Sequence, residues 1–150
     1  MGSATALSIR PADAQDVTLL LDFYRLLEFG PARELSVAAA TAAFDGYAAY
    51  PDFKVYIAER AGMAVGTFAL LIAGSLAHCG RPFGLVEDVV VSSAEHRSGV
   101  GREMMTFAMH LCRQADCYKM ALSSHLNRPE AHAFYESLGF SRHGYSFLVT

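Results

Sequence analysis

The chain has 150 residues, 53% of them hydrophobic and 18% charged, with a formal net charge of −3 at pH 7. This length and composition allow a buried core, which excludes an intrinsically disordered protein and predicts a single domain over residues 1–150. The slight acidity, with Lys and Arg dispersed along the chain, argues against nucleic-acid binding.

The N-terminal residues carry no recognisable targeting signal. They lack the cationic and apolar segments of a secretory signal, and Ala6 stands where myristoylation requires Ser or Thr. The longest apolar stretch, residues 63–77, is interrupted by glycines and is too short to cross a bilayer. We therefore expect a soluble, cytoplasmic protein that does not associate with membranes.

The first half of the chain predicts one strand, two helices and a β-hairpin. In chain order these are a strand at 7–10, a helix from Asp13 to the Gly30-Pro31 stop, a helix at 32–49, and strands at 53–59 and 64–73. Pro11 ends the first strand, and Asp13 can cap the first helix through its carboxylate. The residues between the last two strands, 60–62, have the composition of a tight turn.

The second half alternates strands and helices. We expect a loop at 74–82, a strand at 83–91, a helix from Ser98 or Gly99 to about Gln114, a strand at 117–123, a helix at 129–138 and a final strand at 142–149. The order β-α-α-β-β-β-α-β-α-β predicts an α/β fold with a mixed sheet.

A glycine-rich turn, His96-Arg97-Ser98-Gly99-Val100-Gly101, joins the strand at 83–91 to the following helix. Glycines allow a ligand close to the backbone, and a helix start offers unpaired N–H groups, so the turn predicts a pyrophosphate site. A P-loop is excluded because Arg102 follows Gly101 where Lys is required. A dinucleotide fingerprint is disfavoured because Met104 replaces its third glycine.

A second motif lies near the C-terminus, where residues 127–140 read Asn-Arg-Pro-Glu-Ala-His-Ala-Phe-Tyr-Glu-Ser-Leu-Gly-Phe. Together the two motifs resemble the GNAT acetyltransferase superfamily: the turn resembles its Gln/Arg-x-x-Gly-x-Gly/Ala loop, and residues 134–140 match Phe-Tyr-x-x-x-Gly-Phe. His96 replaces the usual Gln or Arg. Asn127 lies one residue before the family's Asn, whose place Arg128 takes.

The resemblance implies a mixed, mostly antiparallel sheet flanked by helices, with coenzyme A in a gap between two splayed parallel strands, 89–91 and 120–122. It implies acetyl-CoA as co-substrate, a backbone N–H near Val89 that polarises the thioester carbonyl, and Tyr135 as proton donor to the leaving thiolate. It also implies a homodimer. The expected coenzyme A-binding residues are Val89, Val90, Val91, His96, Arg97, Ser98, Gly99, Val100, Gly101, Arg102, Asn127 and Tyr135.

Catalysis also needs a base, because an amine is protonated at neutral pH. Glu87 and Asp88 are adjacent on a strand, so we expect their side chains on opposite faces, with only one lining the acceptor site. Glu87 is preferred because it shares a face with Leu85 and Val89, and Asp88 is the alternative. His78 and His125 are secondary acceptor-binding candidates.

The histidines and cysteines do not predict a metal site. The six histidines lack paired-ligand spacing, and the three cysteines, Cys79, Cys112 and Cys117, lack Cys-x-x-Cys spacing, so reduced thiols are expected.

The sequence therefore predicts an acetyl-CoA-dependent N-acetyltransferase acting directly on a primary amine of a small molecule. Two alternatives stay open: an acetyltransferase acting on protein or peptide amines, and a non-catalytic acyl-CoA-binding sensor. Short likenesses at 117–119 to sugar-phosphate acetyltransferases, and at 131–135 to aminoalkylphosphonate acetyltransferases, do not identify the acceptor.

Overall fold

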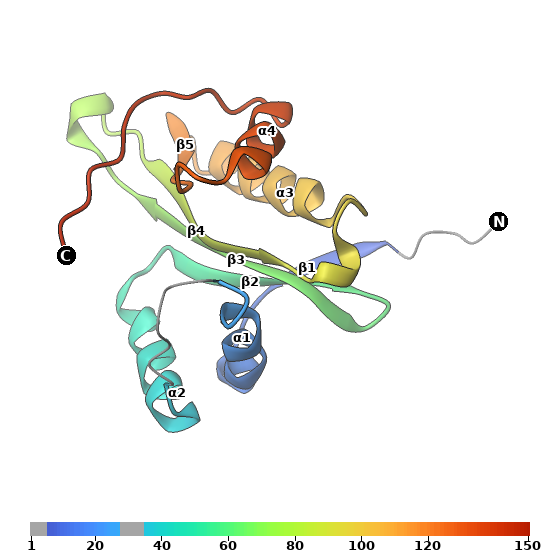
Figure 1. Cartoon of the computed structure of the whole chain (residues 1–150). Helices are drawn as coiled ribbons and strands as arrows, with labels where there is room; N and C mark the ends of the chain where they lie inside the picture. Colours follow the sequence, from blue (N-terminus) through green and yellow to red (C-terminus); the bar gives the residue numbers. More distant parts are fainter. Residues whose placement is uncertain (1–5, 28–34) are drawn as a thin grey trace.

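A computed structural model, which describes residues 6–27 and 35–150, has a five-stranded mixed sheet between two layers of helices (Figure 1). Its elements are β1 (Leu7–Pro11), η1 (Ala14–Asp16), α1 (Val17–Tyr24), α2 (Val37–Asp45), η2 (Gly46–Ala49), β2 (Phe53–Arg60), β3 (Met63–Ala73), η3 (Leu76–His78), β4 (Phe83–Val91), η4 (Ser93–Glu95), α3 (Val100–Gln114), β5 (Lys119–Leu122) and α4 (Pro129–Ser137), where η denotes a 3-10 helix. The strands lie in sequence order; β1 to β4 are antiparallel, and β5 is parallel to β4.

Alternation along β2 divides the core between the two faces of the sheet. Tyr56 and Ala58 pack into the larger core beneath α3, whereas Val55 and Ile57 pack with Leu20 of α1 on the other face. Helices α1 and α2 cover this second face, and α3 and α4 cover the first (Figure 1). The structure thus confirms the expected sheet flanked by helices, and the alternating side chains of β2 contribute to the core on each face.

Two glycines let α3 lie close to the sheet. A Cβ atom on Gly66 of β3 would lie 2.6 Å from the Sδ atom of Met104, and one on Gly84 of β4 would clash with Cys112 Sγ. Met104 and Cys112 are both buried on the face of α3 that meets the sheet. The glycines therefore provide the room that these two side chains occupy.

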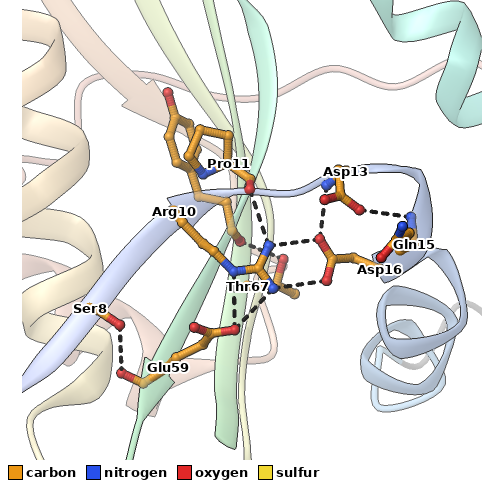
Figure 2. A network of polar contacts seen from close by, with 9 residues as sticks. Ser8, Arg10, Pro11, Asp13, Gln15, Asp16, Glu59 and Thr67 are labelled. Carbon is orange, nitrogen blue, oxygen red and sulfur yellow. Dashed lines mark hydrogen bonds and ion pairs between the residues drawn. The ribbon is translucent and has the colours of Figure 1, made fainter. Parts of the chain in front are cut away.

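An ion-pair network attaches α1 to the edge of the sheet (Figure 2). Arg10 of β1 donates to both carboxylate oxygens of Asp16, at 2.8 and 2.9 Å, and to Glu59 of β2, at 2.9 and 3.1 Å. The guanidinium holds the pKa of Asp16 below its usual value. Asp13 accepts from the Gln15 N–H and donates its own N–H to Asp16, so the predicted cap is confirmed as a capping box.

The prediction of a final strand at 142–149 is wrong. Residues 141–150 form no regular secondary structure, and Tyr145, Phe147, Leu148 and Val149 are each at least 87% exposed. Their alternation has β-strand character, but a strand forms only when its backbone pairs with a neighbour, and no described segment provides one.

The other expected elements differ mainly at their ends. The helix after Asp13 starts as η1 and its α-helical part ends at Tyr24, while the expected stop at Gly30-Pro31 lies outside the described residues. The second helix begins at Val37 behind a Ser36 cap, and its predicted first residues, 32–34, also lie outside them. No helix in the described part of the chain is long and apolar enough to span a membrane.

We predict that Gly84→Ala lowers the free energy of unfolding by about 1–3 kcal/mol, because the added methyl overpacks the contact with Cys112. Chemical denaturation measures this loss. Gly74→Ala, where a Cβ meets nothing within 4 Å, is the matched control and should change stability by less than about 0.5 kcal/mol. The double variant Gly84→Ala/Cys112→Ala should recover part of the loss; no recovery would contradict this account.

Candidate functional site

The parallel strands β4 and β5 pair over only four residues and then separate. The register runs from Phe83 opposite Lys119 to Val86 opposite Leu122, where β5 ends, whereas β4 continues to Val91. Beyond Val86, no described strand pairs with the β5 side of β4. This open edge corresponds to the gap expected between two splayed parallel strands.

A β-bulge in β4 lies at the point where the strands separate. Asp88 has a φ of 51°, and the β3 register shifts so that two β4 residues, Asp88 and Val89, lie opposite one β3 residue. After the bulge the Ser92 N–H donates to Val65 of β3 at 2.8 Å. Because successive N–H groups of a strand point to alternate edges, those of Val91 and Val89 point to the open edge.

The bulge also overturns the expectation that Glu87 and Asp88 lie on opposite faces. Glu87 is opposite Ala69, which belongs to the core beneath α1. Asp88 lies on the same side, since its charge acts on Tyr24 of α1 and Tyr47 of η2. The left-handed backbone at Asp88 breaks the strict alternation on which the expectation rested.

The two carboxyl groups share one environment. Burial, and then the charge of Asp88, raises the pKa of Glu87, and burial raises the pKa of Asp88 itself. Burial and the nearby Asp88 charge also raise the pKa of both Tyr24 and Tyr47. These four groups lie on the α1 side of the sheet, where Glu87 and Asp88 are exposed and the two tyrosines are partly buried, and we call them the acidic cluster.

Sequence reasoning missed the two tyrosines of the acidic cluster. Tyr24 lies among the apolar residues of its helix, and Tyr47 belongs to no motif. A tyrosine on an otherwise apolar face is itself a signal, because its buried hydroxyl needs a polar environment. Their proximity to Asp88, more than 40 residues away in the chain, arises only in the folded protein.

The glycine-rich turn lies at the N-terminus of α3, as expected, and the helix begins at Val100. Arg97 and Gly99 have φ values of 66° and 88°, so the turn contains two left-handed positions. Side chains of Arg97 and Arg102 are exposed at the same helix end. The N-terminal amides of α3 and these cations provide an anion-binding environment.

Glycine is favoured at 101 for a different reason from glycine at 99. A Cβ on Gly101 would lie 3.1 Å from the Cζ atom of Phe134, so the first turn of α3 packs directly on the ring from α4. A Cβ on Gly99 would meet nothing within 4 Å, and its left-handed φ is what favours glycine there. The nearby His96 directs its Nε2 to the Val91 carbonyl, 3.1 Å away, and so links the turn to β4.

Tyr135, on α4, packs between aromatic rings at the edge of the larger core. Its ring centroid lies 5.2 Å from that of Phe134 and 5.7 Å from that of Phe140. The residue contacts the same core that Val89 of β4 and Leu122 of β5 border. Burial raises the pKa of its phenol, so the hydroxyl is protonated at neutral pH and can act as a proton donor.

Three further candidates lie away from these groups or have structural partners. His78 stacks on Tyr118 with ring centroids 3.7 Å apart, at the end of β4 and β5 opposite the gap. His125 Nδ1 accepts the Asn127 N–H at 3.1 Å, so both residues form the turn that enters α4. Within residues 6–27 and 35–150, no three His, Cys, Asp or Glu side chains are arranged to hold a metal ion.

Several known proteins that resemble this chain are named as acetyltransferases. A model described as the acetyltransferase (GNAT) family matches residues 20–140. Glucosamine 6-phosphate N-acetyltransferase 1 of Oryza sativa subsp. japonica is 33% identical over 144 residues, which cover 93% of this chain and 84% of that protein. Glucosamine 6-phosphate N-acetyltransferase of Trypanosoma brucei brucei is 33% identical over 90 residues, 60% of this chain and 59% of that relative's length. The crystal structure of glucosamine-6-phosphate N-acetyltransferase from Arabidopsis thaliana shares the fold, with a TM-score of 0.83 and 21% identity over 97% of this chain and 98% of that one.

Proposed function

Because the chain belongs to the acetyltransferase (GNAT) family and is an N-acetyltransferase, we propose that it transfers the acetyl group of acetyl-CoA directly to a primary amine of a small molecule. The observation that carries this proposal is the open edge of β4, which leads straight into an anion-binding turn at the start of α3. One catalytic domain comprises residues 1–150. It works in the cytoplasm, where reducing conditions suit the three free cysteines.

The turn and the open edge fit the two ends of a coenzyme A molecule. The backbone amides at 97–102 hold the pyrophosphate, together with the side chains of Arg97 and Arg102. The left-handed backbone positions and the N-terminus of α3 support this assignment. The pantetheine arm lies along β4, where the N–H groups of Val89 and Val91 point to the open edge. The same site includes His96, Ser98 and the turn at 127–128, whereas Val100, whose side chain is fully buried, contributes only its backbone N–H.

Acetyl-CoA supplies an acetyl group activated as a thioester. The Val89 N–H donates to the thioester carbonyl and stabilises negative charge there. The amine nitrogen forms the new C–N bond as the C–S bond breaks, and Tyr135 donates its proton to the leaving sulfur. Burial raises its pKa, so the phenol is in the protonated form that a donor requires.

The acidic cluster binds the amine and removes its proton. Glu87 is the base, directly or through a water molecule, and Asp88 is the alternative. Raised pKa values bring both groups closer to neutral pH, where a base both binds and releases protons efficiently. Two carboxylates and two phenols also favour a cationic acceptor over a neutral one.

The names of the relatives suggest which amines to test first. Several are named for glucosamine 6-phosphate, and an aminoalkylphosphonate N-acetyltransferase of Salmonella typhimurium is 28% identical over 69% of this chain. Both acceptors carry a primary amine and a phosphorus oxyanion. We therefore place small phosphorylated or phosphonate-bearing amines first among the candidate acceptors. His78 lies at the end of β4 and β5 opposite the gap, so only His125 stays a secondary contact.

The exposed C-terminal tail supports association into a homodimer. Four large apolar side chains are at least 87% exposed within residues 145–149, and soluble monomers rarely leave such a group uncovered. A second copy of the chain can cover them.

We predict that the protein releases free thiol from acetyl-CoA in the presence of a small primary amine, and that Tyr135→Phe lowers kcat by about 10²–10⁴-fold while the KM for acetyl-CoA changes little. A thiol assay across an amine panel, including peptide amines, measures both quantities. An unchanged kcat would remove the proton-donor role. Turnover on peptide amines alone would favour a protein acetyltransferase, and coenzyme A binding without turnover would favour a sensor.

We predict that Glu87→Gln lowers kcat/KM by about 10²–10⁴-fold, whereas Asp88→Asn shifts the acidic limb of the pH profile to lower pH. The shift follows because the charge of Asp88 helps to raise the pKa of Glu87. Asp88→Asn should also raise thermal stability at pH 7, since a carboxyl whose folded-state pKa is raised costs stability once it ionises. A normal profile in Glu87→Gln, with activity lost in Asp88→Asn, would assign the base to Asp88.

We predict that Phe147→Asp weakens self-association, raising the dissociation constant of the dimer by about 10- to 100-fold through the loss of one buried aromatic side chain. Analytical ultracentrifugation measures the constant. Thr150→Asp, which adds the same charge to the same segment without removing apolar surface, is the control. A wild-type protein that stays monomeric at high micromolar concentration would contradict the dimer.

A further inference from the structure

Arg60, the last residue of β2, is a largely buried cation on the α3 side of the sheet. Its side chain is only 20% exposed, and its Nε atom is fully buried without a hydrogen-bond partner among the described residues. One guanidinium nitrogen donates to Glu95 Oε2 at 2.7 Å, and the other lies 3.9 Å from Glu103 Oε1. The preceding residue, Glu59, faces the other layer, where it pairs with Arg10.

Glu95 connects Arg60 to the glycine-rich turn through its carboxylate. It ends η4, and its carboxylate oxygen Oε2 lies 2.8 Å from the hydroxyl of Ser98 as well as 2.7 Å from Arg60. The Ser98 N–H and hydroxyl also contact the Glu95 carbonyl oxygen, at 3.2 and 2.6 Å. A chain of polar contacts thus runs from the β2–β3 hairpin through Glu95 to the residue just before Gly99.

The charge of Glu95 presents a problem at this position. Its side chain is only 24% exposed, and it sits within four residues of the turn that is to receive a pyrophosphate. An uncompensated carboxylate there repels the ligand more strongly than one in open water, because the surroundings are partly desolvated. Arg60 is the cation that compensates it.

We propose that Arg60 and Glu95 are positioning residues for the cofactor: the pair holds the turn at residues 96–101 in its ligand-binding shape and cancels the charge of Glu95 beside the pyrophosphate. This inference rests on the proposed function, because it assigns the turn to coenzyme A. Neither residue contacts the reacting atoms, so the pair governs cofactor affinity rather than the chemical step.

S-acetylpantetheine, used as a second acetyl donor, distinguishes this role in cofactor binding from a general role in the stability of the fold. It carries the same thioester and the same arm as acetyl-CoA but lacks the pyrophosphate and nucleotide. A defect confined to the turn affects only acetyl-CoA, whereas a general distortion of the fold affects both donors. Arg25→Met, which breaks the exposed ion pair with Asp22 on α1, is a matched control for the loss of one arginine.

Arg60→Met should raise the KM for acetyl-CoA about tenfold, equivalent to about 1.4 kcal/mol of binding free energy, while kcat and the KM for S-acetylpantetheine stay within about twofold. Arg60→Lys, which keeps the charge, should have a smaller effect. In Arg60→Met/Glu95→Gln the KM for acetyl-CoA should fall back toward the wild-type value, because the uncompensated carboxylate is gone. Thermal unfolding of each variant reports whether it is folded.

A parallel rise of KM for both donors would overturn the proposal, as would an unchanged KM for acetyl-CoA in Arg60→Met. The same variants can be tested by calorimetric titration with coenzyme A and with pantetheine, which needs no turnover. Coenzyme A binding that weakens in Arg60→Met sustains the inference even if no amine is acetylated, in which case only the proposed function fails. A wild-type protein that does not bind coenzyme A would overturn both.

Discussion

The arrangement of the site depends on how β4 pairs with its two neighbouring strands, β3 and β5. This strand pairs with β3 over nearly its whole length but with β5 over only four residues. The bulge at Asp88 lies just beyond the point where the pairing with β5 ends. On the open edge, which arises because β5 ends at Leu122, the N–H groups of Val89 and Val91 have no strand partner among the described residues, and on the α1 side the bulge places Glu87 and Asp88 on one face. One extra residue in a strand thus places two carboxyl groups side by side.

Local patterns predicted the elements better than they predicted the site. The limits of β4 agree with the structure because a β-branched run bounded by loop residues is a local signal, and the start of α3 follows from Gly99. The bulge at Asp88 could not be predicted from alternation, because it depends on pairing with β3. The terminal strand failed for a related reason: alternation at 145–149 records a preference for extended backbone, whereas a strand needs a partner.

The last two residues of β2 form ion pairs on both faces of the sheet. Glu59 and Arg60 are adjacent, and strand alternation sends one toward α1 and the other toward α3. Through Arg10 and Asp16 the first fixes the helix that carries Tyr24, and through Glu95 the second fixes the turn before α3. Two neighbouring charges therefore form separate ion pairs on the two faces of the sheet. Neither residue belongs to a sequence motif, which is why the motifs alone did not identify them.

The contact between Gly101 and Phe134 constrains how this chain can change over evolutionary time. The ring of Phe134 rests on the backbone of α3, and Tyr135 is the next residue of α4. A residue larger than alanine at 101 displaces that ring and carries the neighbouring phenol with it, so the two positions constrain each other. The pair is thus a testable case of covariation: related chains with a side chain larger than alanine at the first site should lack phenylalanine at the second.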